Sequence, residues 1–236
     1  MTKLFFSINP KSILLGHDLF AFADFANQAA QHYDFDIYFS CPTVYLSQLA
    51  HQCTNMIISA QTMDISLSKE KMGSVNIDFL QDAGAKAVVL NHDSNPMTYA
   101  DLSKAVEQCR ERRIQSLVCG GDREEIRQIA FLKPDMIICE QNTLIGTGIV
   151  SDMEYINDTN RFIKTICPDT RISQSGGIKS KMDIIRAIWH GADGTGSTSG
   201  IFGSTDPRKT LIEFLDATKE AEKDGGEDDA HETVIF

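Results

Sequence analysis

The segment from residue 136 to residue 148 joins a carboxylate to a glycine-rich turn. A short apolar run, 136–139, leads directly to Glu140, and Gly146 and Gly148 follow after a short loop. An apolar run bounded by turn signals is typical of a buried strand, and the catalytic residues of parallel α/β folds gather where such strands end. Paired glycines allow the backbone to turn its N–H groups toward an anion. We therefore expect Glu140 to act as a base beside a phosphate-binding loop at Gly146, the plainer alternative being a solvated glutamate and an ordinary turn.

Polar side chains and small-residue turns also follow other predicted strands. They are Asn9 and Lys11 after the first strand, His92 after the fourth, Ser175 and Gly177 after the seventh, and Thr198, Ser199 and Gly200 after the eighth. Because the carboxyl ends of the strands of a barrel face one common site, we expect these groups to meet Glu140 there. Each residue alone is more often an ordinary loop residue. An ammonium, an imidazole and a carboxylate at three strand ends together favour an active site.

The three ionisable groups suit the transfer of a proton between adjacent carbons of a hydroxy-carbonyl compound. This reaction needs a base of moderate pKa, and burial raises the pKa of a glutamate into that range. It also needs a donor that polarises the carbonyl, which a neutral His92 provides, and the Lys11 ammonium would stabilise an enediolate and attract phosphate. Asn95 and Pro96 resemble an N-cap and a first helical residue. We therefore expect a helix N-terminus near His92 that disfavours the imidazolium cation.

Strand and helix patterns alternate along the chain. Short apolar runs predict strands at 3–9, 36–41, 55–60, 87–91, 116–119, 135–140, 171–175 and 194–197. Helical patterns follow them at 18–32, 43–52, 76–82, 99–112, 122–131, 152–165, 181–189 and 206–221. The start of the helix at 99–112 resembles a capping box, from Thr98 to Asp101. Eight strand–helix units in 236 residues predict an α/β fold, a single-domain (β/α)8 barrel, with a doubly wound open sheet as the competing arrangement.

The end of the chain differs in composition from the rest. Seven acids and one lysine lie between Glu220 and Glu232 and account for more than half of the net charge of −11. Such a segment buries too little apolar surface to offset its ordering entropy. We therefore expect a barrel over residues 1–219 and a flexible acidic tail over residues 220–236, the competing idea being that Val234-Ile235-Phe236 docks into a groove. The modest charge of the barrel argues against a nucleic-acid partner.

The cysteines and apolar runs indicate the compartment. Six cysteines are scattered without a CxxC pair, so we expect neither a disulfide framework nor a metal site, and a reducing cytoplasm fits best. Leu4-Phe5-Phe6 is too short for a signal peptide, and no apolar run approaches the roughly 20 residues that cross a bilayer. The sequence thus predicts a soluble cytoplasmic protein with no membrane partner.

Several of these motifs resemble the triosephosphate isomerase family, especially its shorter archaeal form, from Lys3 to about Leu215. The matching motifs are Asn9-x-Lys11, Asn91-His92, Cys119, Glu140 with Ile145-Gly146-Thr147-Gly148, Gly177-Ile178 and Thr198-Ser199-Gly200. The resemblance implies a TIM barrel in which Glu140 is the base, His92 the electrophile and Lys11 a third catalytic group, with a lid after Glu140.

The resemblance also implies the reaction and the partners. The implied activity is cofactor-free aldose–ketose isomerisation of a small phosphosugar, with glyceraldehyde 3-phosphate and dihydroxyacetone phosphate as the leading pair, by Glu140-mediated proton transfer through an enediolate. The implied substrate-binding residues are Asn9, Gly146, Ser175, Gly177, Thr198, Ser199 and Gly200. The implied partners are the substrate and further copies of the chain, in a dimer or tetramer.

A few positions depart from the family pattern. Asp93-Ser94 follows the histidine where the family has Ser-Glu, and Gln141 replaces the proline after the base. After the third strand, Gln61-Thr62 stands where the family has Gln-His or Gln-Asn. Met72 replaces the threonine of the interface loop. These positions belong to substrate and subunit contacts, whereas the three catalytic groups are retained, which favours a working isomerase. Two alternatives stay open: an isomerase for another phosphorylated sugar, and a barrel that binds a phosphometabolite without turnover.

Overall fold

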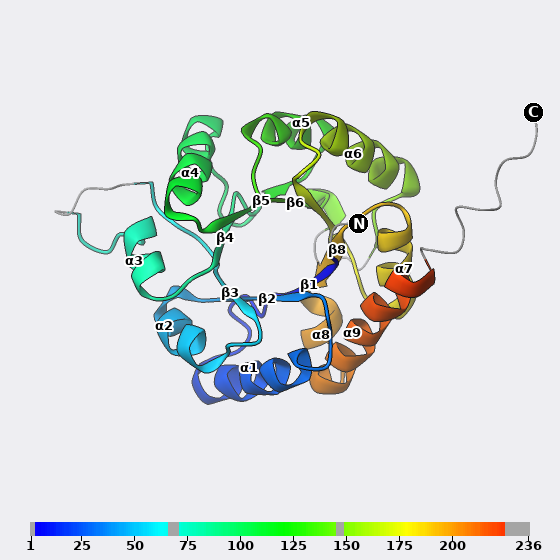
Figure 1. Cartoon of the computed structure of the whole chain (residues 1–236), viewed down its shortest axis with the longest axis horizontal. Coiled ribbons are helices and arrows are strands. Elements are labelled where there is room, and N and C mark those ends of the chain that lie inside the picture. Colours follow the sequence, from blue (N-terminus) through cyan, green and yellow to red (C-terminus); the bar gives the residue numbers. More distant parts are fainter. Residues whose placement is uncertain (1–2, 66–70, 145–148, 225–236) are drawn as a thin grey trace, which may run out of the picture.

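The computed structural model has eight parallel strands that close into a barrel in chain order (Figure 1). It describes residues 3–65, 71–144 and 149–224. The strands are β1 (Phe5–Ile8), β2 (Asp36–Cys41), β3 (Ile57–Ala60), β4 (Ala87–Leu90), β5 (Gln115–Gly120), β6 (Met136–Cys139), β7 (Arg171–Gln174) and β8 (Gly194–Ser197). The first and last strands pair in parallel, with Phe5 opposite Gly194. The predicted (β/α)8 barrel is therefore confirmed, and the open sheet is wrong.

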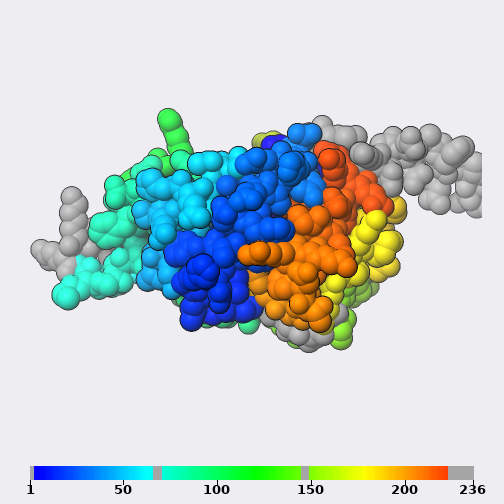
Figure 2. Space-filling view, turned by 90° about the horizontal axis from the view of Figure 1, so that it is seen from below, coloured from blue at the N-terminus to red at the C-terminus, as the bar shows by residue number. Residues whose placement is uncertain are grey.

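Helices surround the barrel and connect successive strands. They are α1 (Gly16–Ala30), α2 (Thr43–Gln52), α3 (Ile77–Asp82), α4 (Tyr99–Arg112), α5 (Arg123–Leu132), α6 (Met153–Ile166), α7 (Lys181–Trp189), α8 (Ser199–Phe202) and α9 (Pro207–Asp224), with a 3-10 turn, η1, at Asn142–Leu144. The sequence does not predict α8 or η1, because a single turn is too short to show a helical period. Figure 2 shows α1 and α9 side by side, where the first and last units of the ring meet. Within the described ranges, no helix has the length and apolarity needed to cross a membrane.

Side-chain caps determine where several helices begin. Thr98 Oγ1 accepts the N–H of Asp101 at 3.2 Å, as the predicted capping residue of α4. Asp122 Oδ1 accepts the N–H of Glu125 at 2.8 Å and caps α5 in the same way. A cap of this kind contributes about 1 kcal/mol, which explains why α5 begins one residue after its predicted start.

The barrel interior contains a separate apolar cluster that includes Phe5, Tyr38, Leu117 and Met136. The rings of Phe5 and Tyr38 meet edge to face, with centroids 5.8 Å apart. A Cβ on Gly194 would lie only 2.3 Å from the carbonyl oxygen of Phe5. This close approach explains why a glycine-rich segment of low β-propensity closes the barrel as β8. A larger apolar layer packs between the strands and the helices.

Arg171, at the start of β7, closes the N-terminal end of the barrel. Its guanidinium donates to Asp36 Oδ2 at 2.8 Å, to the Tyr38 hydroxyl at 3.0 Å and to the carbonyl of Lys3 at 2.8 Å. It also lies over the Phe5 ring, 4.6 Å from the centroid. These contacts join β7 to the first two strands, while the guanidinium Nε is buried without a hydrogen-bond partner among the described residues.

Helix α9 continues past the domain boundary expected from the charge. Its last residue is Asp224, and Ala221 is 1% exposed. Lys181 Nζ pairs with Glu220 Oε2 at 2.5 Å. The first residues of the expected tail thus belong to the last helix of the barrel, because Ala217 and Ala221 share its buried face. The rest of the expected tail lies outside the described residues.

Candidate active site

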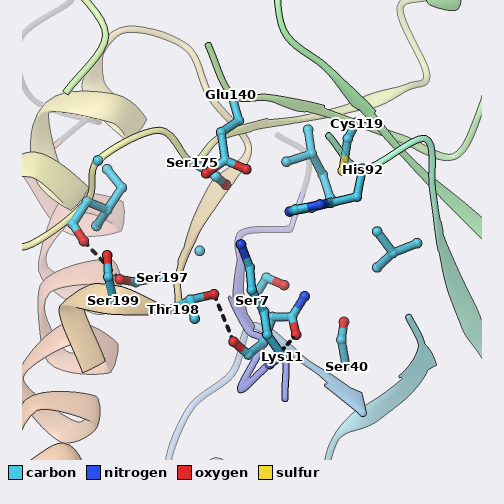
Figure 3. A pocket seen from close by; sticks show the side chains of 16 residues that line it. Ser7, Lys11, Ser40, His92, Cys119, Glu140, Ser175, Ser197, Thr198 and Ser199 are labelled. Atoms are coloured by element: carbon cyan, nitrogen blue, oxygen red, sulfur yellow. Dashed lines mark hydrogen bonds between the residues drawn. The ribbon is translucent and has the colours of Figure 1, made fainter. Parts of the chain in front are cut away.

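A cavity of about 140 Å³ lies at the C-terminal ends of the strands. The residues of the predicted site that line it are Asn9, Lys11, His92, Glu140, Ser175, Gly177, Thr198 and Ser199. Ser7, Ser40 and Cys119, from three strands, also contribute to its wall. In Figure 3 the side chains of Lys11, His92 and Glu140 point toward the same space. The barrel therefore brings the predicted acid–base groups together.

Two predicted residues are not placed on this wall. Gly146 lies outside the described residues. Gly200 lies in α8, and its N–H donates to Ser197 Oγ at 3.2 Å, while the Ser197 hydroxyl donates to the carbonyl of Ile178 at 2.8 Å. The N–H of Gly200 thus contributes to the internal structure of its loop.

Lys11 reaches the cavity from a turn in the left-handed region, with a φ of +50°. This conformation costs a residue with a side chain about 1–2 kcal/mol, so other contacts must hold it. Asn9 Oδ1 accepts the N–H of Lys11 at 2.9 Å, and Gln61 Nε2 donates to Asn9 Oδ1 at 3.0 Å and to the Lys11 carbonyl at 3.1 Å. The Thr198 hydroxyl donates to the carbonyl of Asn9 at 2.8 Å. The turn that carries the ammonium is thus held by the loops after β3 and β8.

The contacts of His92 determine its tautomer. Its Nδ1 accepts the N–H of Ser94 at 3.1 Å and lies 2.8 Å from the Ser94 hydroxyl. Because an amide N–H can only donate, Nδ1 carries no proton, and the ring is the neutral form with its proton on Nε2. Nε2 is buried and has no hydrogen-bond partner among the described residues. Burial lowers the pKa of His92, the Lys11 ammonium lowers it further, and Asp93 raises it.

The helix N-terminus expected beside His92 is not there. The chain turns back after His92, and the N–H of Asn95 donates to the His92 carbonyl at 2.7 Å. Helix α4 begins only after its Thr98 cap. The prediction of Asn95 and Pro96 as helix start is wrong, because the side chain of Asn95 is bonded to the loop after β3. The two contacts from Ser94 take the place of the helix in favouring a neutral ring.

Glu140 directly follows β6. Its N–H donates to the carbonyl of Gly120 at 3.0 Å and extends the pairing of β6 with β5 by one residue. Burial raises the pKa of the Glu140 carboxyl, the Lys11 ammonium opposes this rise, and Asp93 adds to it. A carboxylate whose pKa is raised accepts a proton more readily than a solvated one.

The loop after β7 approaches the chain that follows Glu140. Gly177 has a φ of +75°, and a Cβ at this position would lie 2.1 Å from the carbonyl oxygen of Ile149. Both the backbone conformation and the close approach therefore require glycine here. The hydroxyls of Ser175 and Ser173 lie 2.6 Å apart. Small side chains thus line this side of the cavity.

The described residues offer acid–base chemistry in the cavity. Among them, no group of three or more His, Cys, Asp or Glu side chains is arranged to hold a metal ion. All six cysteines lie within the described ranges and are buried and free. The charged or basic groups that face the cavity are the carboxylate of Glu140, the imidazole of His92 and the ammonium of Lys11, and burial raises the pKa of the Cys119 thiol on the same wall.

Comparison with known proteins identifies the family. The sequence model of triosephosphate isomerase matches residues 15–196 of the chain. The chain belongs to the triosephosphate isomerase family. It is 33% identical to the triosephosphate isomerase of Methanothermus fervidus over 164 residues, which cover 68% of this chain and 74% of that protein. The corresponding enzyme of Sulfolobus acidocaldarius is 26% identical over 84% of this chain and 87% of its own. The chain is thus an isomerase, and its resemblance to the archaeal form of the family is confirmed.

The structure explains two departures from the family pattern. Ser94 lies one position later than the family serine, yet both its N–H and its hydroxyl contact the His92 ring. Thr62 Oγ1 accepts a bond from the Asn95 side chain at 2.7 Å and joins the loops after β3 and β4. Gln61, which is not among the predicted site residues, holds the Lys11 turn. Its position directly after β3 is the same strand-end signal that identifies the catalytic groups.

Proposed function

We propose that this family member interconverts glyceraldehyde 3-phosphate and dihydroxyacetone phosphate without a cofactor. The observation that carries the proposal is the convergence of three groups on one cavity: a buried carboxylate, a neutral imidazole with its proton on Nε2, and an ammonium. Binding of a phosphate ester alone would need neither the base nor the neutral donor.

In the proposed reaction, the Glu140 carboxylate removes a proton from the carbon beside the carbonyl. The electron pair of the broken C–H bond forms the enediolate double bond, and the carbonyl electrons move to oxygen. The N–H of His92 Nε2 donates to the developing oxyanion, and the Lys11 ammonium stabilises its charge. Glu140 then returns the proton to the adjacent carbon, while the hydroxyl proton passes between the two oxygens through His92. Atoms and charge balance, because substrate and product are isomers.

The substrate phosphate is proposed to bind between the loops that follow β6, β7 and β8. Gly177 and Ser199 line this part of the cavity, and the Lys11 side chain approaches it from β1. Backbone N–H groups of tight, small-residue loops suit a phosphate dianion. A crystal grown in phosphate is expected to hold the anion between these loops, and an anion bound only elsewhere would count against this arrangement.

Turnover on a panel of phosphorylated aldoses and ketoses tests the proposal. We expect isomerisation of glyceraldehyde 3-phosphate, measured with a coupled assay, to exceed that of the longer sugar phosphates. A preference for a longer sugar would indicate an isomerase of another substrate. Binding of phosphate esters with no turnover of any of them would indicate a regulatory barrel.

We also propose that the chain forms a homo-oligomer, a dimer or a tetramer. The side chain of Met72, at the position of the family interface loop, is 94% exposed, and Val44 is 83% exposed. The support for an interface at Met72 is its match to the family interface loop together with this exposure. Light scattering during size-exclusion chromatography tests this, and Met72→Asp is expected to shift the population toward smaller species. A monomeric wild-type chain would contradict the proposal.

A further inference from the structure

Glu125 lies outside the catalytic cavity but contacts the loop that carries His92. It is in the first turn of α5, where its own N–H is bonded to the Asp122 cap. Its Oε1 accepts from Asn91 Nδ2 at 2.9 Å, and its Oε2 accepts from the N–H of Gly121 at 2.8 Å. One carboxylate therefore joins the residue before His92 to the loop after β5.

Asn91 forms the turn before His92, with a backbone φ of +56°. Its side chain also donates to the carbonyl of Cys119 at 3.0 Å and accepts the N–H of Met97 at 2.9 Å. These bonds hold Asn91 in the left-handed region, which asparagine adopts more readily than most residues with a side chain. The direction in which the next residue, His92, enters the cavity depends on this turn.

The same carboxylate acts on the strand end that carries the base. Gly121, whose N–H is held by Glu125, accepts the Tyr155 hydroxyl at 2.7 Å through its carbonyl. The preceding carbonyl, of Gly120, accepts the N–H of Glu140 at 3.0 Å. The N–H of Gly121 and the carbonyl of Gly120 belong to one peptide group, which thus connects Glu125 to the backbone of the base.

We propose that Glu125 is a positioning residue that holds His92 and Glu140 in their relative places during isomerisation. Its carboxylate is hydrogen-bonded to neither group, and it acts through Asn91 on one side and through the Gly120–Gly121 peptide group on the other. A carboxylate suits this position because it accepts two bonds from two donors. A glutamine of the same size would turn its NH2 group toward one of them. The expected changes in kcat and KM rest on the proposed function, whereas the expected placement of His92 does not.

The test compares Glu125→Gln and Glu125→Ala with Glu124→Gln, the neighbouring exposed acid of the same helix turn. Misplacement of catalytic groups by a fraction of an ångström lowers kcat more than it changes KM. We expect kcat to fall by about tenfold in Glu125→Gln and by up to about a hundredfold in Glu125→Ala. KM should change by less than about threefold, and Glu124→Gln should match the wild type.

A spectroscopic readout separates this inference from the proposed function. The Nε2 proton of neutral His92 is observable by 15N-edited NMR in the protein without substrate, and its resonance is expected to move or broaden in both Glu125 variants but not in Glu124→Gln. If the wild type turned over no sugar phosphate, the proposed function would fail, while this resonance would still test the role of Glu125. An unchanged resonance, or wild-type kcat in Glu125→Ala, would overturn the inference.

Discussion

The two ends of the barrel contain similar kinds of side chain and use them differently. At the N-terminal end, Arg171 is bonded to Asp36, Tyr38 and backbone carbonyls and is covered by the Phe5 ring. At the C-terminal end, ionisable groups line a cavity, and the Nε2 atom of His92 is buried without a partner among the described residues. At the N-terminal end Arg171 makes several contacts and leaves its Nε without a partner among the described residues, whereas at the C-terminal end Lys11, His92 and Glu140 border a cavity that a ligand can enter.

This difference explains how the fold supports an active site. A buried polar atom without a partner costs about 1–3 kcal/mol, so the stability of the barrel must come from elsewhere. The apolar layers and the Arg171 network supply it at a distance from the cavity. Mutations at the two ends should therefore separate stability from turnover.

The largest expected effect on stability is at Arg171. Arg171→Met removes the donor to Asp36 Oδ2 and to the Tyr38 hydroxyl, while Asp36 keeps Lys3 and Tyr38 keeps Gln115. Loss of the donor to partly buried acceptors is expected to cost about 1–3 kcal/mol. Chemical denaturation should show this loss, while turnover per folded molecule stays at the wild-type value. The control is Arg161→Met, whose side chain is 78% exposed. An Arg171 variant of unchanged stability would remove the distinction between the two ends.

Lys11→Met should have the opposite profile. Removal of one group that stabilises the developing oxyanion lowers kcat by about 10²–10³, while the free energy of unfolding stays within about 0.5 kcal/mol. Because the ammonium lowers the pKa of Glu140, the acid limb of kcat/KM should move to higher pH in the variant. Lys104→Met, on the exposed face of α4, is the control. Wild-type turnover without Lys11 would contradict its catalytic role.

Truncation at the C-terminus tests which residues of the last helix and of the segment after it contribute to stability. A chain that ends at Lys219 loses the buried Ala221 and the Lys181–Glu220 pair, at a cost of about 1–2 kcal/mol. A chain that ends at Asp224 keeps both and should melt like the full chain, with the same turnover. Calorimetry on the two truncated chains checks this. If the chain that ends at Asp224 melted at a lower temperature than the full chain, the apolar residues at 234–236 would dock on the barrel.

The smallest expected effect is a shift of the pH profile. Asp93 raises the pKa of Glu140, so Asp93→Asn should lower that pKa and keep the base ionised to lower pH. The acid limb of kcat/KM should then move to lower pH by less than about one unit, because salt screens an exposed charge. Asp34→Asn, at the other end of the barrel, should leave the profile unchanged. A shift to higher pH would contradict the assignment of this limb to Glu140.

The fold and the three acid–base groups follow from the sequence for one physical reason. Parallel strands with helical crossovers place every strand end at the same face, so Lys11, His92 and Glu140 meet however far apart they lie in the chain. That inference needs only the order of the elements and the residue that ends each strand. Gln61 satisfies the same criterion, and the structure adds it to the site as the support of the Lys11 turn.

What the sequence does not give is the outcome of local competitions for hydrogen bonds. Asn95 and Thr98 are both good caps, and only the packed loops decide that Thr98 begins the helix. The N–H of Gly200 bonds to a serine of its own loop. The proposed role of Glu125 depends on the direction of helix α5 relative to Asn91 and Gly121, and no short sequence motif encodes that direction. Composition predicts a tail from residue 220, yet helix α9 continues to Asp224, because Ala217 and Ala221 lie on its buried face.

The central claim is that Glu140 is the base, and exchange of substrate hydrogen with solvent tests it most directly. With the wild type in D2O, dihydroxyacetone phosphate should acquire deuterium at the hydroxyl-bearing carbon beside its carbonyl. Glu140→Gln should lower the rate of this exchange by about 10²–10⁴-fold. The same variant should still bind a phosphate-bearing analogue, because the proposed phosphate contacts, which include Gly177 and Ser199, do not involve the Glu140 carboxylate. Exchange at a rate near that of the wild type in Glu140→Gln would contradict the account.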